Sequence, residues 1–141
     1  MLNWDEKSLK LALEYIIEHI NLNNLSLDKQ RYLKDKFNKV LMFEKVNSYL
    51  LDYNWNKFQN ISKEDAVNIL ETLLMNKQIE LSLDWIALYG ITKDQMLYID
   101  EDFISESLEV NQKNMLIISK FLHELNVNQA LVVCEKIYIA C

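Results

Sequence analysis

The feature that most constrains this chain is its near lack of turn-forming residues: it has 141 residues, one glycine (Gly90) and no proline. β-Hairpin turns depend on glycine and proline, which supply positive or fixed φ angles. Phosphate-binding loops and dinucleotide-binding fingerprints each need several glycines. The chain is therefore expected to be helical, and P-loop and Rossmann-type functions are excluded.

Hydrophobic residues make up 50% of the chain and charged residues 26%, as in an ordinary globular protein. A chain of this length fits one domain with one core. We expect an all-α fold over residues 1–141, a compact irregular bundle of six or seven helices around a single core.

Apolar residues recur at three- and four-residue spacing along most of the chain, which is the period of an amphipathic helix. The longest stripe predicts one helix from about Asp28 to about Tyr53. Trp55 and Phe58 would follow in a loop or helix end. The segment 129–140 favours a helix, with a strand as the alternative because its β-branched residues suit extended structure.

Side chains able to cap a helix precede the other apolar stripes. Gly90 is placed to end a short helix with a left-handed residue, and Thr92 to begin another helix that runs to about Leu108. The predicted caps are Asn3 with Glu6 as its capping-box partner, Ser62, Ser82, Thr92 with Gln95 as its partner, and Asn111.

The segment from Leu83 to Phe103, with Gly90 between two expected helices, has the layout of a helix-turn-helix unit. In the DNA-binding version the second helix brings positive charge to the groove. Here that helix carries Asp100 and its acidic neighbours, and Lys93 is its only base, so DNA reading by this unit is not expected.

No residue pattern for covalent or metal chemistry is present. His19 and His123 match no metal-ligand spacing, and Cys134 lies in an apolar segment, where a cysteine usually packs as a small hydrophobic residue. We therefore expect no enzyme activity, metal or cofactor. With two cysteines, no basic and apolar leader and no long apolar run, the default location is the reducing cytoplasm.

Charge is unevenly distributed along the chain. The net charge is −6, with +1 in residues 1–60 and −7 in residues 61–141. Such a balance discourages contact with nucleic acids and anionic membranes. The densest acidic stretch favours binding of a basic protein, as an immunity protein or inhibitor would bind a toxin or nuclease. The expected contact residues are Asp94, Tyr98, Asp100, Glu101, Asp102, Phe103, Glu106 and Glu109.

The first half of the chain provides a second hypothesis, namely a basic helix that binds nucleic acid or serves in assembly. Its candidate residues are Lys29, Arg31, Lys34, Lys36, Lys39 and Lys45.

Two further alternatives stay open. A pocket between helices would suit an enzyme or ligand carrier. An exposed cluster of aromatic residues would favour a homodimer. The candidate aromatic residues are Trp4, Tyr49, Tyr53, Trp55, Phe58 and Trp85.

Overall fold

The computed structural model describes residues 5–19 and 24–140. Within them the chain forms nine α-helices and one 3-10 helix and no strand, so the all-α prediction is confirmed. The prediction of six or seven helices is wrong for two reasons. The expected helix from Thr92 to about Leu108 is two helices, Lys93–Met96 and Glu101–Ser107, and Trp55–Phe58 forms a helix of its own. The helices group into two compact units that divide between Ile61 and Ser62.

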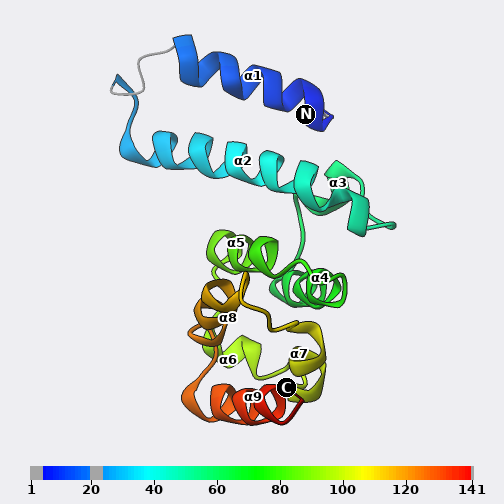
Figure 1. Ribbon diagram of the computed structural model, residues 1–141. Coiled ribbons are helices and arrows are strands. Elements are labelled where there is room, and N and C mark those ends of the chain that lie inside the picture. The colour runs from blue at the N-terminus through cyan, green and yellow to red at the C-terminus, as the bar shows by residue number, and fades with distance from the viewer. Residues whose placement is uncertain (1–4, 20–23, 141) are drawn as a thin grey trace. The chain divides into compact units, whose positions relative to one another are not determined.

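The first unit is built on a helical hairpin. Helix α1 (Glu6–His19) packs along α2 (Leu27–Val46), and the two run antiparallel (Figure 1). An ion pair of 3.1 Å from Lys10 Nζ to Glu44 Oε2 joins the start of α1 to the end of α2. Leu13 is the buried residue of α1, whereas the buried residues of α2 lie in its C-terminal half. The core of this unit therefore gathers around the end of α2.

Helix α2 ends at Val46, earlier than the predicted Tyr53. A short 3-10 helix, η2 (Asn47–Tyr49), follows, and Leu50 is extended with φ −115° and ψ 91°. Leu50 is nevertheless buried. The apolar spacing that predicts a longer helix thus continues past the helix end, because an extended residue also reaches the core.

Aromatic side chains close the core of the first unit. Trp55 and Phe58 belong to helix α3 (Trp55–Phe58), and their rings lie 5.7 and 4.8 Å from the ring of Phe43, between centroids. Both are buried, as is Trp85 in the second unit. Tyr49 and Tyr53 are half-buried, and Trp4 lies outside the described residues. Core packing accounts for three of the six aromatic residues that suggested a homodimer.

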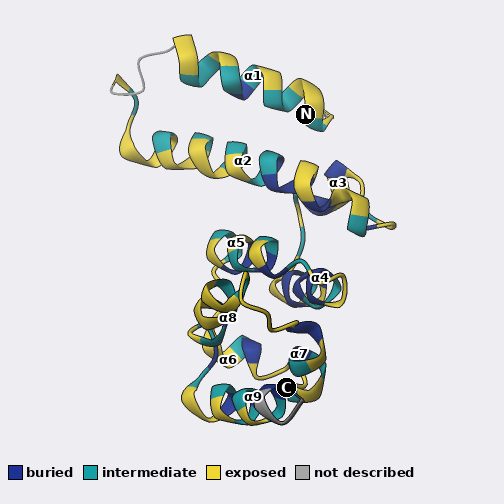
Figure 2. Cartoon of the chain, in the orientation of Figure 1, coloured by how far each residue is buried: buried dark blue, intermediate teal, exposed yellow. Residues whose placement is uncertain are grey.

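The second unit surrounds a larger apolar core (Figure 2). In it α4 packs against α5, α5 against α8, and α7 against α9. Its buried side chains come from all six helices, so each helix turns one face inward. The helices are α4 (Lys63–Met75), α5 (Ile79–Tyr89), α6 (Lys93–Met96), α7 (Glu101–Ser107), α8 (Met115–Leu122) and α9 (Val127–Ala140).

Several predicted helix boundaries of this unit are confirmed. Ser62 accepts a hydrogen bond from the Asp65 amide at 3.1 Å and forms a capping box at the start of α4. Thr92 forms the same motif with Gln95 at the start of α6. Gly90 ends α5 in the left-handed region with φ 61°. Local sequence signals therefore fix these ends.

Two predicted caps are wrong. Helix α5 begins at Ile79, so Ser82 lies inside it, and its buried hydroxyl donates to the Gln78 carbonyl at 2.6 Å. Helix α8 begins at Met115, and the Asn111 side chain instead closes the preceding turn. At the chain start, the predicted cap Asn3 lies outside the described residues.

The segment 129–140 is helical, as favoured, and belongs to α9. Its β-branched residues do not prevent a helix because tertiary burial outweighs intrinsic preference. In the described part of the chain, no helix is long and apolar enough to span a bilayer.

Candidate functional site

The acidic segment is not one continuous helix, contrary to the prediction of a helix from Thr92 to about Leu108. Helix α6 ends at Met96 and α7 begins at Glu101. Met96 and Ile99 are buried on either side of the turn, whereas Tyr98 at its tip is 84% exposed. The break thus lets two apolar residues enter the core while it raises an aromatic ring into solvent.

A side chain from α9 fixes this break. Gln129 is 2% exposed, and its amide Nε2 donates to the carbonyls of Met96 at 2.9 Å and Ile99 at 3.4 Å. An interrupted helix leaves backbone carbonyls without the hydrogen bond that the next helical turn would supply. A buried carbonyl that stays unpaired destabilises the fold. The Met96 carbonyl also accepts from the Ile99 amide at 3.1 Å. Gln129 adds a donor to both carbonyls from a distant part of the sequence, so α9 helps to set the position of the Tyr98 turn.

The break also changes the electrostatic setting of the acidic residues. Glu101 and Asp102 lie in the first turn of α7, and Asp94 in the first turn of α6. Carboxylates are favourable there because the helix dipole is positive at its N-terminal end. The Lys136 ammonium on α9 donates a hydrogen bond to Asp102, and this bond raises the pKa of Lys136 above its usual value. The helix starts and Lys136 therefore favour negative charge at these positions.

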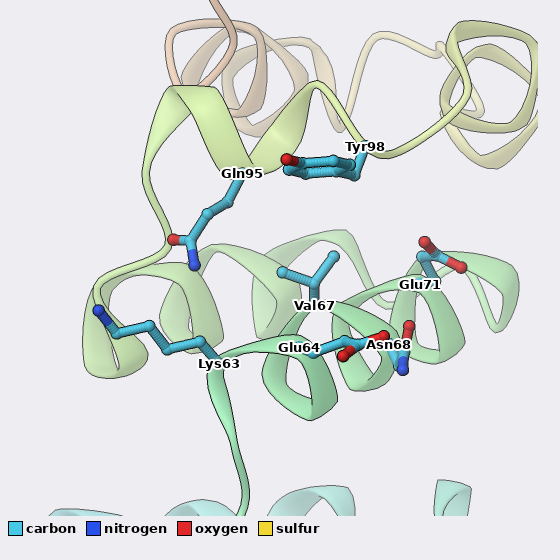
Figure 3. A pocket seen from close by; sticks show the side chains of 7 residues that line it. All are labelled: Lys63, Glu64, Val67, Asn68, Glu71, Gln95 and Tyr98. Atoms are coloured by element: carbon cyan, nitrogen blue, oxygen red, sulfur yellow. The ribbon is translucent and has the colours of Figure 1, made fainter.

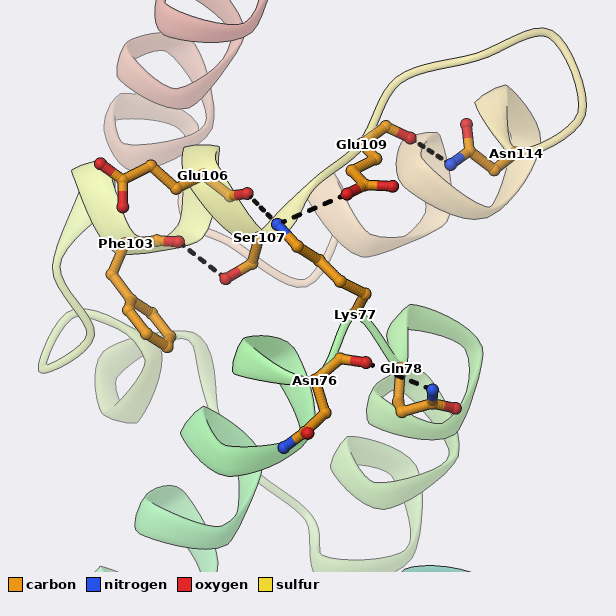
Figure 4. Close-up of polar contacts among 8 residues, drawn as sticks. All are labelled: Asn76, Lys77, Gln78, Phe103, Glu106, Ser107, Glu109 and Asn114. Carbon is orange, nitrogen blue, oxygen red and sulfur yellow. Dashed lines mark hydrogen bonds and ion pairs between the residues drawn. The ribbon is translucent and has the colours of Figure 1, made fainter. Parts of the chain in front are cut away.

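At the other end of α7, one lysine pairs with one of the two remaining acids (Figure 4). Lys77 Nζ lies 3.8 Å from Glu109 Oε1 and donates to the backbone carbonyl of Glu106. The Glu106 carboxylate itself points away from Lys77 in this view. The Asn114 amide donates to the Glu109 carbonyl. Lys77 therefore pairs with the carboxylate of Glu109 and not with that of Glu106, whose side chain is exposed.

We define the acidic surface as the eight residues predicted to contact a partner. Six of them are exposed: Asp94, Tyr98, Asp100, Asp102, Glu106 and Glu109. Glu101 and Phe103 are half-buried, so Phe103 offers less of its ring as an anchor than Tyr98 does.

A cleft that the sequence does not predict lies beside this surface (Figure 3). It encloses about 410 Å³ between α4 and α6. Val67 of α4 forms an apolar floor, and the Tyr98 ring lies above it with one face turned toward α4. Its lining residues are Lys63, Glu64, Val67, Asn68, Glu71, Gln95 and Tyr98. The spacing of Glu64, Asn68 and Glu71 along α4 hints at a shared polar face, but only the fold shows that Tyr98 covers it.

A second hollow, of about 300 Å³, lies between α8 and α9. It is lined mainly by apolar side chains, among them Met115, Leu122 and Ile137, and Ser119 and Cys134 are its least apolar members. It offers few groups able to orient a polar ligand.

The six basic residues of α2 do not form one continuous exposed patch, because two of them contact other side chains of the protein. Lys39 pairs with Asp35 at 2.9 Å. Lys36 donates to the Gln59 side chain at 3.1 Å and lies over the Trp55 ring. The remaining four, Lys29, Arg31, Lys34 and Lys45, are exposed.

The histidines take part in local contacts. His123 Nδ1 lies 2.7 Å from the Ser119 carbonyl, and the His19 ring packs beside Tyr15. Over residues 5–19 and 24–140, no group of three histidine, cysteine or acidic side chains is arranged to hold a metal ion.

Comparison with known proteins adds no relative: no family model matches the chain, and neither a curated protein nor a solved structure matches it significantly.

Proposed function

We propose that this protein works by binding a basic protein partner through the acidic surface, as an immunity protein or inhibitor that covers a toxin or nuclease. The proposal is non-catalytic. Carboxylates of α6 and α7 would pair with lysine and arginine side chains of the partner, and Tyr98 would act as an anchor. Binding would occlude the working surface of the partner.

The observation that carries this proposal is the exposure of Tyr98 between exposed carboxylates. A tyrosine that is 84% exposed gains nothing from the core of its own chain. Tyrosine is enriched among the residues that dominate binding energy at protein interfaces. Asp94 precedes it and Asp100 follows it, and both are exposed. An aromatic ring framed by negative charge suits a basic protein surface.

The surrounding charge also favours rapid association. Opposite charges steer partners together and raise association rates, most strongly at low salt. Lys77 and Lys136 each pair with one carboxylate of the acidic surface, and the surface retains an excess of acids. A basic partner would relieve the repulsion among these like charges.

The test compares the wild-type chain with Asp100→Asn/Glu101→Gln/Asp102→Asn and with Tyr98→Ala. Each is immobilised and used to capture proteins from the source cells, and captured proteins are purified and titrated against each variant. We expect a basic partner whose affinity falls at least tenfold with the triple variant, and whose activity the wild-type chain inhibits.

The matched control removes the same number of charges elsewhere on the second unit. Glu80, Asp84 and Glu135 are exposed and lie outside the acidic surface, so Glu80→Gln/Asp84→Asn/Glu135→Gln should bind as the wild type does. An equal loss of affinity in the two triple variants would show that binding depends on the net charge of the protein and not on the acidic surface. Unchanged affinity in Asp100→Asn/Glu101→Gln/Asp102→Asn would refute the proposal.

A second candidate function is nucleic-acid binding by the exposed face of α2. One observation favours it: Tyr32 is 64% exposed between the exposed cations Arg31 and Lys34. An exposed ring flanked by cations can stack on an unpaired base. Titration with labelled single-stranded RNA at two salt concentrations tests it. Binding that weakens with salt and with Tyr32→Ala would support this function, and no binding at low salt would remove it.

A further inference from the structure

The cleft between α4 and α6 has an aromatic roof, an apolar floor and a negatively charged side. Tyr98 of the α6–α7 turn covers Val67 of α4, and the carboxylates of Glu64 and Glu71 lie along α4 below the ring (Figure 3). Lys63 lies at the opposite end of the cleft from Glu71 in this view. A cation entering on the Glu71 side therefore meets carboxylates before it meets Lys63.

The two carboxylates of the cleft, those of Glu64 and Glu71, form no ion pair within residues 5–19 and 24–140. The side-chain oxygen Oε1 of Gln95 accepts from the Thr92 backbone amide at 2.8 Å in the capping box. The side-chain nitrogen of Gln95 points toward α4. The capping box thus holds one wall of the cleft in place, while the acids of the other wall stay free to bind.

We propose that this cleft receives an arginine side chain of the basic partner, which makes it the anchor point of the interface. The inference rests on the proposed function and adds to it α4, a helix outside the acidic surface. The aliphatic stem of the arginine would lie on Val67, and its guanidinium would stack on the Tyr98 ring and donate to Glu64 and Glu71.

The shape of the cleft favours arginine over lysine. A guanidinium is planar and stacks on an aromatic face, and it can donate to two carboxylates at once. An ammonium group is compact and strongly hydrated, so it gains less from a flat ring and an apolar floor. The cleft volume of about 410 Å³ leaves room for one long side chain.

The experiment uses the full chain, labelled for NMR, and N-acetylarginine N-methylamide as the probe. The citrulline analogue, which has nearly the same shape and no charge, is the matched ligand control. We expect saturable shifts of Tyr98, Gln95 and Glu71 signals with arginine, contacts from its side chain to the Tyr98 ring, and weaker shifts with citrulline.

Variants assign the effect to the cleft. Glu64→Gln/Glu71→Gln should weaken arginine binding about fivefold, the size expected for partly exposed ion pairs. Glu80→Gln/Asp84→Asn removes the same charge from α5 and should leave binding unchanged. Equal binding of citrulline and arginine, equal loss in both double variants, or absence of saturable shifts would each overturn the assignment.

Failure of the cleft assignment can be distinguished from failure of the proposed function. If the partner depends on Asp100, Glu101 and Asp102 while Glu64→Gln/Glu71→Gln binds it normally, the cleft assignment fails and the function stands. If arginine binds in the cleft but no basic partner depends on the acidic surface, the function fails and the arginine site stands.

Discussion

Gln129 is a polar residue that the core needs. Its amide donates to two backbone carbonyls at the α6–α7 break. Its own Oε1 is buried and accepts no hydrogen bond from the part of the chain that the structure describes. The Gln129 side chain therefore stabilises the α6–α7 break through its Nε2 donor, even though its Oε1 acceptor is not hydrogen-bonded in the described residues. Apolar neighbours alone could not replace it.

Replacing Gln129 by methionine keeps the side-chain volume and removes the donor. We expect the free energy of unfolding to fall by about 1–3 kcal/mol, because both carbonyls lose the Gln129 amide in a buried site. The Met96 carbonyl retains its bond from the Ile99 amide at 3.1 Å. Urea unfolding followed by circular dichroism measures the change. Asn128→Ala, at the exposed neighbouring position, is the control and should stay within about 0.5 kcal/mol of wild type. Equal stability of Gln129→Met and wild type would contradict this role.

Asp5 makes the start of α1 sensitive to acid. Its carboxylate accepts a hydrogen bond of 2.7 Å from the Ser8 amide, and this bond holds the pKa of Asp5 below its usual 3.8. A lowered folded pKa stabilises the helix above pH 3.8, and the contribution is lost as the pH falls through the lower folded value.

We therefore expect Asp5→Asn to be less stable than wild type at pH 6, and the difference to shrink at pH 3. Asparagine keeps the acceptor oxygen and removes only the charge, so the pH-dependent part is isolated. Unfolding curves of both proteins at the two pH values provide the measurement. A difference that is the same at pH 6 and pH 3 would show that the Asp5 charge does not stabilise α1.

At the scale of elements, capping boxes define where α4 and α6 begin. The Ser62 hydroxyl accepts from the Asp65 amide, and the Asp65 carboxylate accepts from the Ser62 amide at 3.4 Å. Both bonds satisfy amides that an isolated helix end leaves free. Helix α4 in turn carries Glu64 and Glu71, so its cap also sets the position of the cleft.

Ser62→Ala should lower the free energy of unfolding by about 1 kcal/mol through loss of this cap. Thermal and urea unfolding measure it. Ser119→Ala, an exposed position inside α8, is the matched serine control and should change stability by less than about 0.5 kcal/mol. If Ser62→Ala and Ser119→Ala lower the free energy of unfolding equally, the capping box of α4 does not stabilise the protein more than an ordinary exposed serine does.

Elements with strong local signals were predictable from the sequence. The capping pairs and Gly90 mark ends of α4, α5 and α6 because their bonds join residues close in the chain. The break after Met96 was not predictable, because its stabilising donor lies on Gln129, far along the sequence. The cleft was missed for the same reason: it depends on Tyr98 and α4 meeting in space.

At the scale of the whole molecule, the chain divides into two compact units, whereas the sequence predicts one core. The second unit buries side chains from six helices. The first unit relies on a helical hairpin and an aromatic cluster at one end. Small assemblies bury a smaller fraction of their surface and are less stable alone. The two units should therefore differ in their capacity to fold independently.

A fragment of residues 62–141 should fold by itself and unfold in one cooperative transition, whereas a fragment of residues 1–61 should show only partial helicity. Circular dichroism and the dispersion of NMR signals distinguish the two results. Lack of dispersed NMR signals from the fragment 62–141 would contradict this prediction. So would a fragment 1–61 that unfolds as cooperatively as the fragment 62–141 does.

The contacts of α9 have a genetic consequence. Gln129 holds the Tyr98 turn and Lys136 pairs with Asp102, so the acidic surface is supported by a helix that is coded later than the surface itself. A stop codon between residues 110 and 126 would spare every residue of that surface and still remove its support from α9. Such a truncation should therefore abolish any partner binding by the acidic surface as fully as loss of the surface itself.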